Sequence, residues 1–149
     1  MTPPLNVHAT AVALRVGGAW RAVLLRGPSG AGKSDLALRL VDGGARLVAD
    51  DRTDLAVERG RVIARPPATI AGLIEVRGLG IVTLPRARRL ARAPVALLVD
   101  LVAPKRIERM PQPSREELLG IALPVLALAP FEASAAAKLR LALAETANA

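Results

Sequence analysis

The sequence predicts an α/β domain in which a mixed β-sheet is flanked by helices. Residues 27–34 read GPSGAGKS, a phosphate-binding loop that follows an apolar, strand-like run and precedes a helical pattern. Hydrophobic residues make up 52% of the chain, but its only aromatic residues are Trp20 and Phe131. The core must therefore be aliphatic, as in sheets that helices cover. Segments that resemble strands outnumber those that resemble helices, which favours a mixed sheet over a purely parallel one.

The predicted elements follow one another closely. Residues 10–16 and 21–25 read as strands, and Gly17-Gly18 between them predicts a hairpin. A helix follows Lys33 and ends near Gly43-Gly44, because glycine readily adopts the left-handed conformation that caps helices. The other expected elements are a short strand at 46–51, a hairpin of strands at 55–58 and 61–65, strands at 73–76, 95–102 and 123–128, and a terminal helix at 132–145.

The loop at 27–34 matches the complete pattern G-x-x-x-x-G-K-[S/T]. In such loops the backbone amides turn inward on a nucleotide's phosphates, and the N-terminus of the next helix adds partial positive charge. We expect Lys33 to reach the β- and γ-phosphates and the Ser34 hydroxyl to bind Mg²⁺. The sequence thus predicts ATP and Mg²⁺ binding, and the nucleotide-binding residues are Gly27, Pro28, Ser29, Gly30, Ala31, Gly32, Lys33 and Ser34.

Two aspartates end the short apolar strand at 46–51. An aspartate in this position can lie beside the Mg²⁺ of a phosphate loop. Of two adjacent carboxylates, one can hold the metal through water while the other accepts a proton from an attacking hydroxyl. A solvated strand end is the alternative interpretation. Because only 16 residues separate Lys33 from Asp50, we expect this strand to be the neighbour of the strand before the loop.

The segment 74–81, IEVRGLGI, is the next unusual one. Glu75 and Arg77 share a strand face because side chains alternate along a strand. Gly78 and Gly80 allow close approach of the backbone. The carboxylate and the guanidinium could hold Mg²⁺ and a transferring phosphoryl group, or they could form an ion pair at the surface; the residues alone favour neither.

Composition limits the other function classes. A formal charge of +8, with 18 Arg and 3 Lys, fits a phosphorylated ligand or an acidic partner. The arginines are scattered and almost no aromatic residue can stack on bases, which argues against nucleic acid. The chain has no cysteine, no run long enough to cross a membrane and no signal-like N-terminus, so we expect one cytoplasmic domain over residues 1–149.

Taken together, GPSGAGKSDLALRLVDGGARLVADD at 27–51 and IEVRGLGI at 74–81 resemble the catalytic domain of HPr kinase/phosphorylase. The resemblance covers 8–81 well and 95–144 loosely. It implies a P-loop kinase fold akin to phosphoenolpyruvate carboxykinase, in a short form with the C-terminal catalytic domain only. It also implies a hexamer that phosphorylates a serine of HPr, the phosphocarrier of the bacterial sugar phosphotransferase system, and that can remove this phosphate by phosphorolysis.

The resemblance also implies roles for single residues. Asp51 would accept the proton of the serine, and His8 would match an active-site histidine. Arg109 would match a downstream catalytic arginine, with Arg106 as a competitor. The implied catalytic set is Asp51, His8, Lys33, Arg77 and Arg109, and the implied metal set is Ser34, Asp50 and Glu75.

One departure from the family bears on the reverse reaction. Longer members use a loop of the form Pro-x-Arg-x-Gly-Arg in dephosphorylation, whereas this chain has no arginine between Pro124 and Lys138. We therefore expect kinase activity with little phosphorolysis. Two alternatives stay open, a small-metabolite kinase built on the same loop and an ATP-sensing module that transfers no phosphate.

Overall fold

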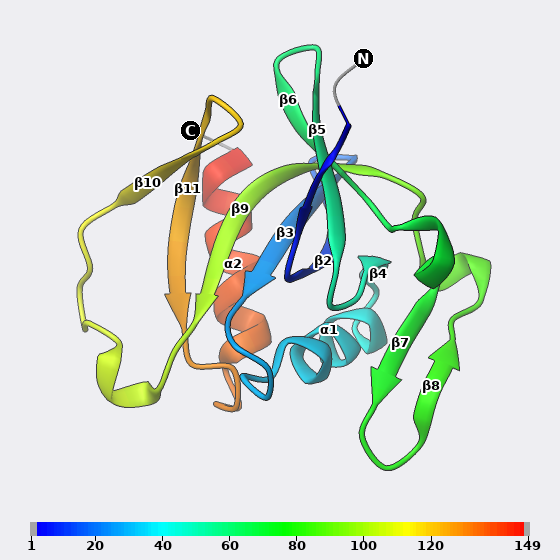
Figure 1. Ribbon diagram of the computed structural model, residues 1–149. Coiled ribbons are helices and arrows are strands. Elements are labelled where there is room, and N and C mark those ends of the chain that lie inside the picture. The colour runs from blue at the N-terminus through cyan, green and yellow to red at the C-terminus, as the bar shows by residue number, and fades with distance from the viewer. Residues whose placement is uncertain (1–2, 148–149) are drawn as a thin grey trace.

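A curled sheet carries both helices on one of its faces and a small separate hairpin at its side (Figure 1). The computed structural model describes residues 3–147, so the outermost residues of the predicted domain, 1–2 and 148–149, lie outside it. The strands are β1 (Leu5–Val7), β2 (Ala9–Val16), β3 (Ala19–Arg26), β4 (Arg46–Ala49), β5 (Thr53–Glu58), β6 (Arg61–Arg65), β7 (Leu73–Val76), β8 (Gly80–Thr83), β9 (Ala93–Leu101), β10 (Ser114–Leu118) and β11 (Ile121–Leu128). The helices are α1 (Lys33–Asp42) and α2 (Ala135–Ala147), with short 3-10 helices η1 (Ala68–Ile70), η2 (Arg86–Arg88) and η3 (Pro104–Arg106).

The large sheet branches at β9. One path runs β1-β5-β6-β9-β3-β2-β4, and β11, which carries β10 on its outer side, also pairs with β9. β9 is parallel to β3 and β11, whereas the other strand pairs of this sheet are antiparallel. The predicted mixed sheet is therefore confirmed. The parallel pairing of β3 with β9 places their carboxyl ends at the same edge, where the phosphate loop follows β3.

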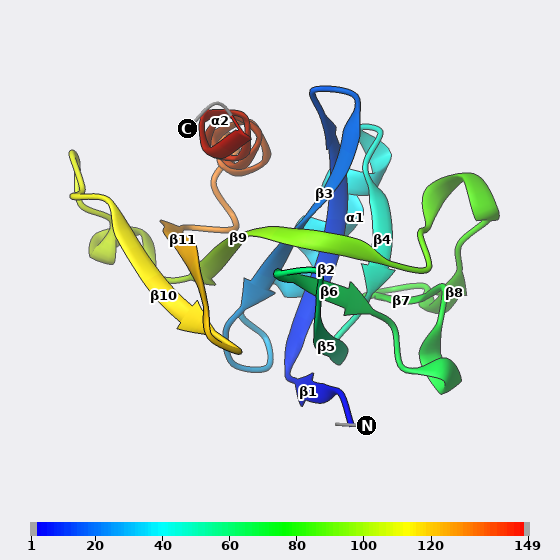
Figure 2. The same cartoon turned by 90° about the horizontal axis from the view of Figure 1, so that it is seen from above.

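Aliphatic clusters fill both faces of the sheet. On the helix side, Leu36 and Leu40 of α1 and Leu139 of α2 pack with buried residues of the central strands, including Val23 and Val99. The opposite face buries mainly alanine, valine and leucine under β5 and β6 (Figure 2). Because aromatic residues are nearly absent from the chain, small and branched aliphatic side chains provide this packing on both sides.

Glycines flank helix α1, and its end before Gly43-Gly44 is the one that the sequence predicts. Gly32 precedes it in the left-handed conformation, with φ of 100°, and Gly44 follows with φ of 108°. The amide of Ala45 donates to the carbonyl of Leu40, which closes the last turn in the manner of a glycine-terminated helix. Neither described helix combines the length and the apolarity that crossing a membrane requires.

The expectation that β3 and β4 are neighbours is wrong, because β2 lies between them and pairs with both. Gly17 and Gly18 have φ of 58° and 79°, which suits the tight turn that folds β2 back along β3. Residues 9–14 of β2 are buried and mostly small, so this strand fits inside the sheet. Sequence separation between the loop and the aspartates did not reveal this insertion, since β2 precedes both.

Other differences between the predicted and the observed elements concern three strands and the start of α2. Strands β1, β8 and β10 have no counterpart among the predicted elements, because the first two have three and four residues and β10 consists mainly of exposed polar residues. Helix α2 starts at Ala135, three residues later than expected. The residues before it, including Pro130 and Phe131, form a loop that contacts α1 and the phosphate loop instead.

Arg26, at the end of β3, fastens β10 to the central sheet. Its guanidinium donates to Asp100 on β9, with Nε 2.8 Å from Oδ1, and to Glu116 on β10, with Nη1 2.6 Å from Oε2. The hydrogen bond from Arg26 holds the pKa of Glu116 below its usual range. The outer hairpin is thereby tied to the residue that immediately precedes the phosphate loop.

The ion pair between Arg26 and Glu116 should make the free energy of unfolding sensitive to acid. Because the folded pKa of Glu116 is lowered, its contribution is complete at neutral pH and is lost as the pH falls below the unfolded value toward the folded one. We expect Glu116→Gln to lower the free energy of unfolding at pH 7 by less than about 1 kcal/mol, since the carboxylate is well exposed. Urea unfolding at several pH values should show this difference vanishing in acid. Glu117→Gln is the control, and an equal loss in it would contradict the assignment.

Candidate active site around the phosphate loop

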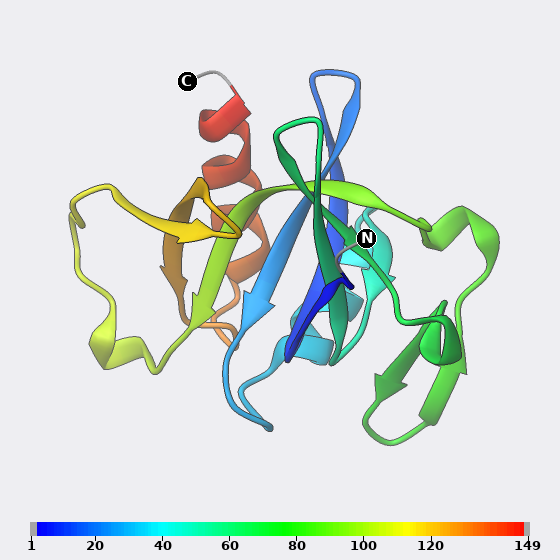
Figure 3. The ribbon, with the colours of Figure 1, turned by 45° about the horizontal axis from the view of Figure 1, so that its top comes forward.

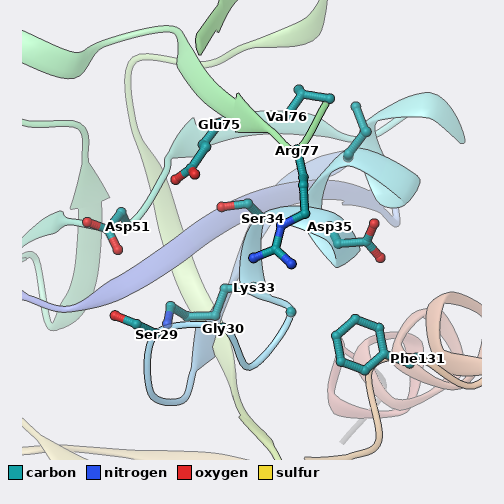
Figure 4. Close-up of a pocket in the computed structure, with 12 residues that line it drawn as sticks. Ser29, Gly30, Lys33, Ser34, Asp35, Asp51, Glu75, Val76, Arg77 and Phe131 are labelled. Atoms are coloured by element: carbon teal, nitrogen blue, oxygen red, sulfur yellow. The ribbon is translucent and has the colours of Figure 1, made fainter. Parts of the chain in front are cut away.

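A pocket of about 430 Å³ lies where the phosphate loop, the start of α1 and the β7–β8 hairpin meet. Its lining residues are Ser29, Gly30, Gly32, Lys33, Ser34, Asp35, Leu38, Asp51, Glu75, Val76, Arg77 and Phe131. Figure 4 shows the oxygen atoms of Ser34, Glu75 and Asp51 facing a common region, with the Arg77 guanidinium above Lys33. The structure thus brings together most of the predicted site residues from segments that are distant in the sequence.

The phosphate loop has its binding shape in the structure. Gly30 and Gly32 have φ of 82° and 100°, a region that favours glycine. A Cβ on Gly32 would also lie 2.8 Å from the ring of Phe131, so a larger residue there would displace this ring. The ammonium of Lys33 is buried and donates to the carbonyls of Gly27, at 2.6 Å, and Pro28, at 3.1 Å. These bonds hold a positive charge at the base of the loop.

The carboxylate of Asp50 joins three segments at the site. Its Oδ1 accepts hydrogen bonds from the hydroxyls of Thr10, at 3.0 Å, and Ser34, at 2.7 Å. Its Oδ2 accepts one from the backbone amide of Glu75, at 2.9 Å. Asp50 is 6% exposed, so these three donors replace most of the water that an ionised carboxylate requires. Through Asp50, β2, α1 and β7 are held in fixed relative positions.

The carboxylate of Asp51, in contrast to that of Asp50, is exposed. Its φ of 68° is in the left-handed region, where aspartate is one of the few residues found besides glycine. Its amide donates to the Thr10 hydroxyl at 3.0 Å, which stabilises this turn. The turn lets adjacent carboxylates point apart: Asp50 is buried, whereas the side chain of Asp51 is 63% exposed and lines the pocket.

His8 is the histidine that the structure brings to the site. Its Nε2 lies 2.8 Å from Oδ1 of Asp51, although the two residues are 43 positions apart. His8 lies between β1 and β2, and Asp51 lies between β4 and β5. Because β2 pairs with β4 and β1 pairs with β5, both strand pairs hold His8 beside Asp51. The histidine can therefore orient the Asp51 carboxylate and exchange a proton with it.

Glu75 and Arg77 both line the pocket, and within the described residues they form no ion pair with each other. The interpretation of these residues as a surface ion pair is therefore wrong for this structure. The hydrogen bond from the Glu75 amide to Asp50 fixes the start of this hairpin. Two charges of opposite sign are consequently available to a ligand.

The residues present fit a magnesium ion that is held together with phosphate groups. In the part of the chain that the structure describes, no three His, Cys, Asp or Glu side chains are grouped closely enough to hold a metal by themselves. Mg²⁺ in nucleotide sites is typically bound by one or two carboxylates together with substrate phosphates. Glu75 and the Ser34 hydroxyl in one pocket with Lys33 provide such an incomplete set of ligands.

Some predicted residues lie outside the pocket lining. Gly27, Pro28 and Ala31 form the back of the loop, and Asp50 lies behind Ser34. Arg109 lies in the exposed segment between η3 and β10 and does not line the pocket.

Two residues that no sequence pattern predicts, Thr10 and Phe131, also lie at the site. Thr10 bridges the two aspartates, and Phe131, 69% exposed, borders the loop at Gly32. A threonine within a buried strand and an aromatic residue in a loop gave no recognisable pattern. Their proximity to the phosphate loop depends on the folded chain.

Comparisons with known proteins agree with this geometry. Residues 2–139 match the family model described as HPr Serine kinase C-terminal domain. The chain is 48% identical over 63 residues to the HPr kinase/phosphorylase of Clostridium tetani, and 48% identical over 60 residues to that of Clostridium beijerinckii. These alignments cover 42% and 40% of this chain but only 21% and 20% of those longer proteins.

The structural comparison extends over almost the whole chain. The fold is similar to the structure described as the Hpr(Ser) kinase/phosphatase from Coxiella burnetii, with a TM-score of 0.78 and 27% identity. The match covers 97% of this chain and 90% of that one. It confirms the fold class predicted from the sequence.

The position of Phe131 predicts a contact with the non-phosphate part of a nucleotide. An aromatic ring at the edge of a phosphate loop offers a stacking surface for a base, which is worth about 1–3 kcal/mol in comparable cases. We expect Phe131→Ala to weaken ATP binding about fivefold or more, as measured by calorimetry. Inorganic tripolyphosphate, which has no base, should bind both proteins equally well. Equal weakening of both ligands would show that the ring only supports the loop.

Proposed function

The chain belongs to the HPr serine kinase C-terminal domain family, and from this premise we propose that it is an ATP- and Mg²⁺-dependent protein kinase that phosphorylates a serine of HPr. The predicted family is confirmed, and the activity is inferred from it. The observation that supports this activity most is the exposed carboxylate of Asp51, which touches His8 at the mouth of a phosphate-loop pocket. A nucleotide-binding loop alone needs no such carboxylate.

The chain's own groups provide for binding of the phosphates. The loop amides and the start of α1 attract the phosphate oxygens, and the Lys33 ammonium can exchange its bonds to loop carbonyls for bonds to the β- and γ-phosphates. Arg77 adds a second cation in the same pocket. In our proposal both cations stabilise the negative charge on the phosphoryl group during transfer.

Ser34 and Glu75 are the proposed direct ligands of Mg²⁺, and Asp50 is proposed to hold the ion through water. When bound, Mg²⁺ supplies charge compensation to the phosphates. Asp50 already accepts three hydrogen bonds, so its role is to orient Ser34 and to bind water next to the metal. Glu75 lines the pocket from the neighbouring hairpin, and its carboxylate forms no ion pair within residues 3–147.

Asp51 is the proposed proton acceptor. The serine oxygen forms a bond to the γ-phosphorus as the bond to the bridging oxygen of ADP breaks, and the serine proton moves to an oxygen of Asp51. His8 orients that carboxylate through the 2.8 Å contact. Arg109 stays a proposed catalytic residue: since it does not line the pocket, it can act only through a movement of its segment or from a neighbouring copy in the proposed hexamer.

The exposure of Asp51 favours a protein substrate over the alternatives. A small-metabolite kinase has to enclose its substrate to exclude water, whereas 63% of the Asp51 side chain is exposed. A protein that presents a serine from outside can cover this carboxylate itself. An ATP sensor without transfer would gain nothing from the contact between Asp51 and His8. The cytoplasmic location and the role in controlling the phosphotransferase system belong to the same proposal.

The kinase proposal predicts separate effects on turnover and on binding. Asp51→Asn keeps shape but removes the proton acceptor, so we expect kcat for transfer from γ-labelled ATP to HPr to fall about 100-fold or more with nearly unchanged ATP affinity. Lys33→Ala should reduce both the turnover and the affinity for ATP. Asp42→Asn, an exposed aspartate at the end of α1, is the control. If Asp51→Asn kept full activity, Asp51 would not be the base; if wild type transferred no phosphate to HPr, the function itself would be wrong.

The loop after β11 supports the prediction of slow phosphorolysis. Where this loop reaches the phosphate-loop pocket it presents Phe131, an uncharged residue, and no arginine stands between Pro124 and Lys138. Inorganic phosphate is a dianion that needs cationic or backbone donors in line with the phosphoserine. We expect phosphoserine-HPr with millimolar phosphate to be dephosphorylated far more slowly than HPr is phosphorylated. Comparable rates in one preparation would mean that another arginine binds the phosphate.

A further inference from the structure

A second cavity, of about 400 Å³, lies at the end of the sheet remote from the phosphate loop. It is lined by Arg21, Arg61, Pro94, Val95, Ala96, Arg115, Ala122, Leu123, Pro124 and Thr146. The ladder between β9 and β11 begins at Leu98 and Val125, and the cavity is bordered by residues 94–96 and 122–124 that precede it on the two strands. Figure 3 shows β9 and β11 side by side at their carboxyl ends and β9 curving away toward its amino end. We call this cavity the arginine cavity.

Strand pairing explains why a cavity opens here. β9 and β11 pair from Leu98 and Val125 onward, but not before. The residue before Val125 is Pro124, which has no amide hydrogen to extend the ladder. At its amino end β9 instead pairs with β6, at Ala93 and Pro94. The two strands therefore diverge, and the space between them is bordered by backbone that this ladder does not use.

The charges in the arginine cavity are unbalanced. Arg21, Arg61 and Arg115 come from β3, β6 and β10, and no Asp or Glu is among the lining residues. Within the described part of the chain, none of the three forms an ion pair. By contrast, Arg26, Arg39, Arg65 and Arg92 all have carboxylate partners. Arg115 donates to the carbonyl of Ala122 at 3.4 Å. Three arginines thus line one cavity in which no lining residue carries a negative side chain.

Arg21 carries the strongest indication of a ligand. Its Nε is buried and has no hydrogen-bond partner among the residues that the structure describes. A buried charged donor without an acceptor is destabilising, and such groups in native proteins usually have a partner. The end of α2 near Thr146 offers about half a negative charge, which is too little to balance three cations.

We propose that the arginine cavity binds a small anion that carries phosphate or carboxylate groups. Guanidinium groups bind the planar or tetrahedral oxygens of such anions through paired hydrogen bonds. The cavity is distinct from the phosphate-loop pocket: Arg21 and Arg26 are five residues apart on β3, about 17 Å of extended strand. A nucleic acid is a poor occupant because the lining contains no aromatic residue.

The test is an amide NMR titration of the full chain with inorganic phosphate and, separately, with citrate. We expect at least one anion to cause saturable shifts at Val95, Ala96, Leu123 and Thr146, separable from those at residues 27–34. Arg21→Gln should weaken this binding about tenfold or more. Arg86→Gln removes an exposed arginine outside both pockets and should leave it unchanged. If Arg21→Gln does not fold, Arg61→Gln tests the same expectation.

The two anions distinguish the sources of the ligand. Tighter phosphate binding would assign phosphate esters, and tighter citrate binding would assign polycarboxylates. Absence of saturable shifts at the cavity with both anions would overturn the proposal. So would equal weakening by Arg86→Gln, which would indicate attraction by net charge alone. If the wild-type chain binds neither anion and Arg21→Gln abolishes its self-association, a second copy of the chain occupies the cavity instead.

Discussion

The buried carboxylate of Asp50 is the interaction on which the rest of the site depends. It accepts hydrogen bonds from Thr10 on β2, Ser34 on α1 and the amide of Glu75 on β7, and these segments are not neighbours in the sequence. A carboxylate that is 6% exposed is stable only while such donors are in place. The same bonds that satisfy Asp50 therefore set the position of the phosphate loop relative to the hairpin carrying Glu75 and Arg77. The hydrogen bonds of Asp50 therefore contribute both to the stability of the fold and to the geometry of the site.

The exposure of Asp51 depends on the buried position of Asp50. Because Asp50 is buried directly after β4 and Asp51 adopts a left-handed conformation, the next carboxylate turns outward toward His8. Adjacent residues thus receive opposite environments, one structural and one accessible to a substrate hydroxyl. The exposure of Asp51 suits a proposed protein substrate, since the incoming protein can complete the enclosure.

Local patterns predicted much of this molecule. The strand, loop and helix around GPSGAGKS depend on glycine conformation and on apolar periodicity, and both are visible in the sequence. The insertion of β2 between β3 and β4 was not predictable, because strand order depends on pairing between distant segments. Thr10 and Phe131 were missed for the same reason, since each reaches the site from a remote element. The arginine cavity arises where two strands part, and scattered arginines in a sequence give no sign of it.

The most direct test of the central role of Asp50 is hydrogen exchange at the amide of Glu75. In the wild-type chain this amide donates to Asp50, whereas in Asp50→Ala it has no acceptor there. We expect its exchange to accelerate strongly, together with that of the β7–β8 amides, while amides in the centre of β3 and β9 stay protected. Unchanged protection of Glu75 in a folded Asp50→Ala chain would show that the hairpin is positioned by other contacts and would contradict this account.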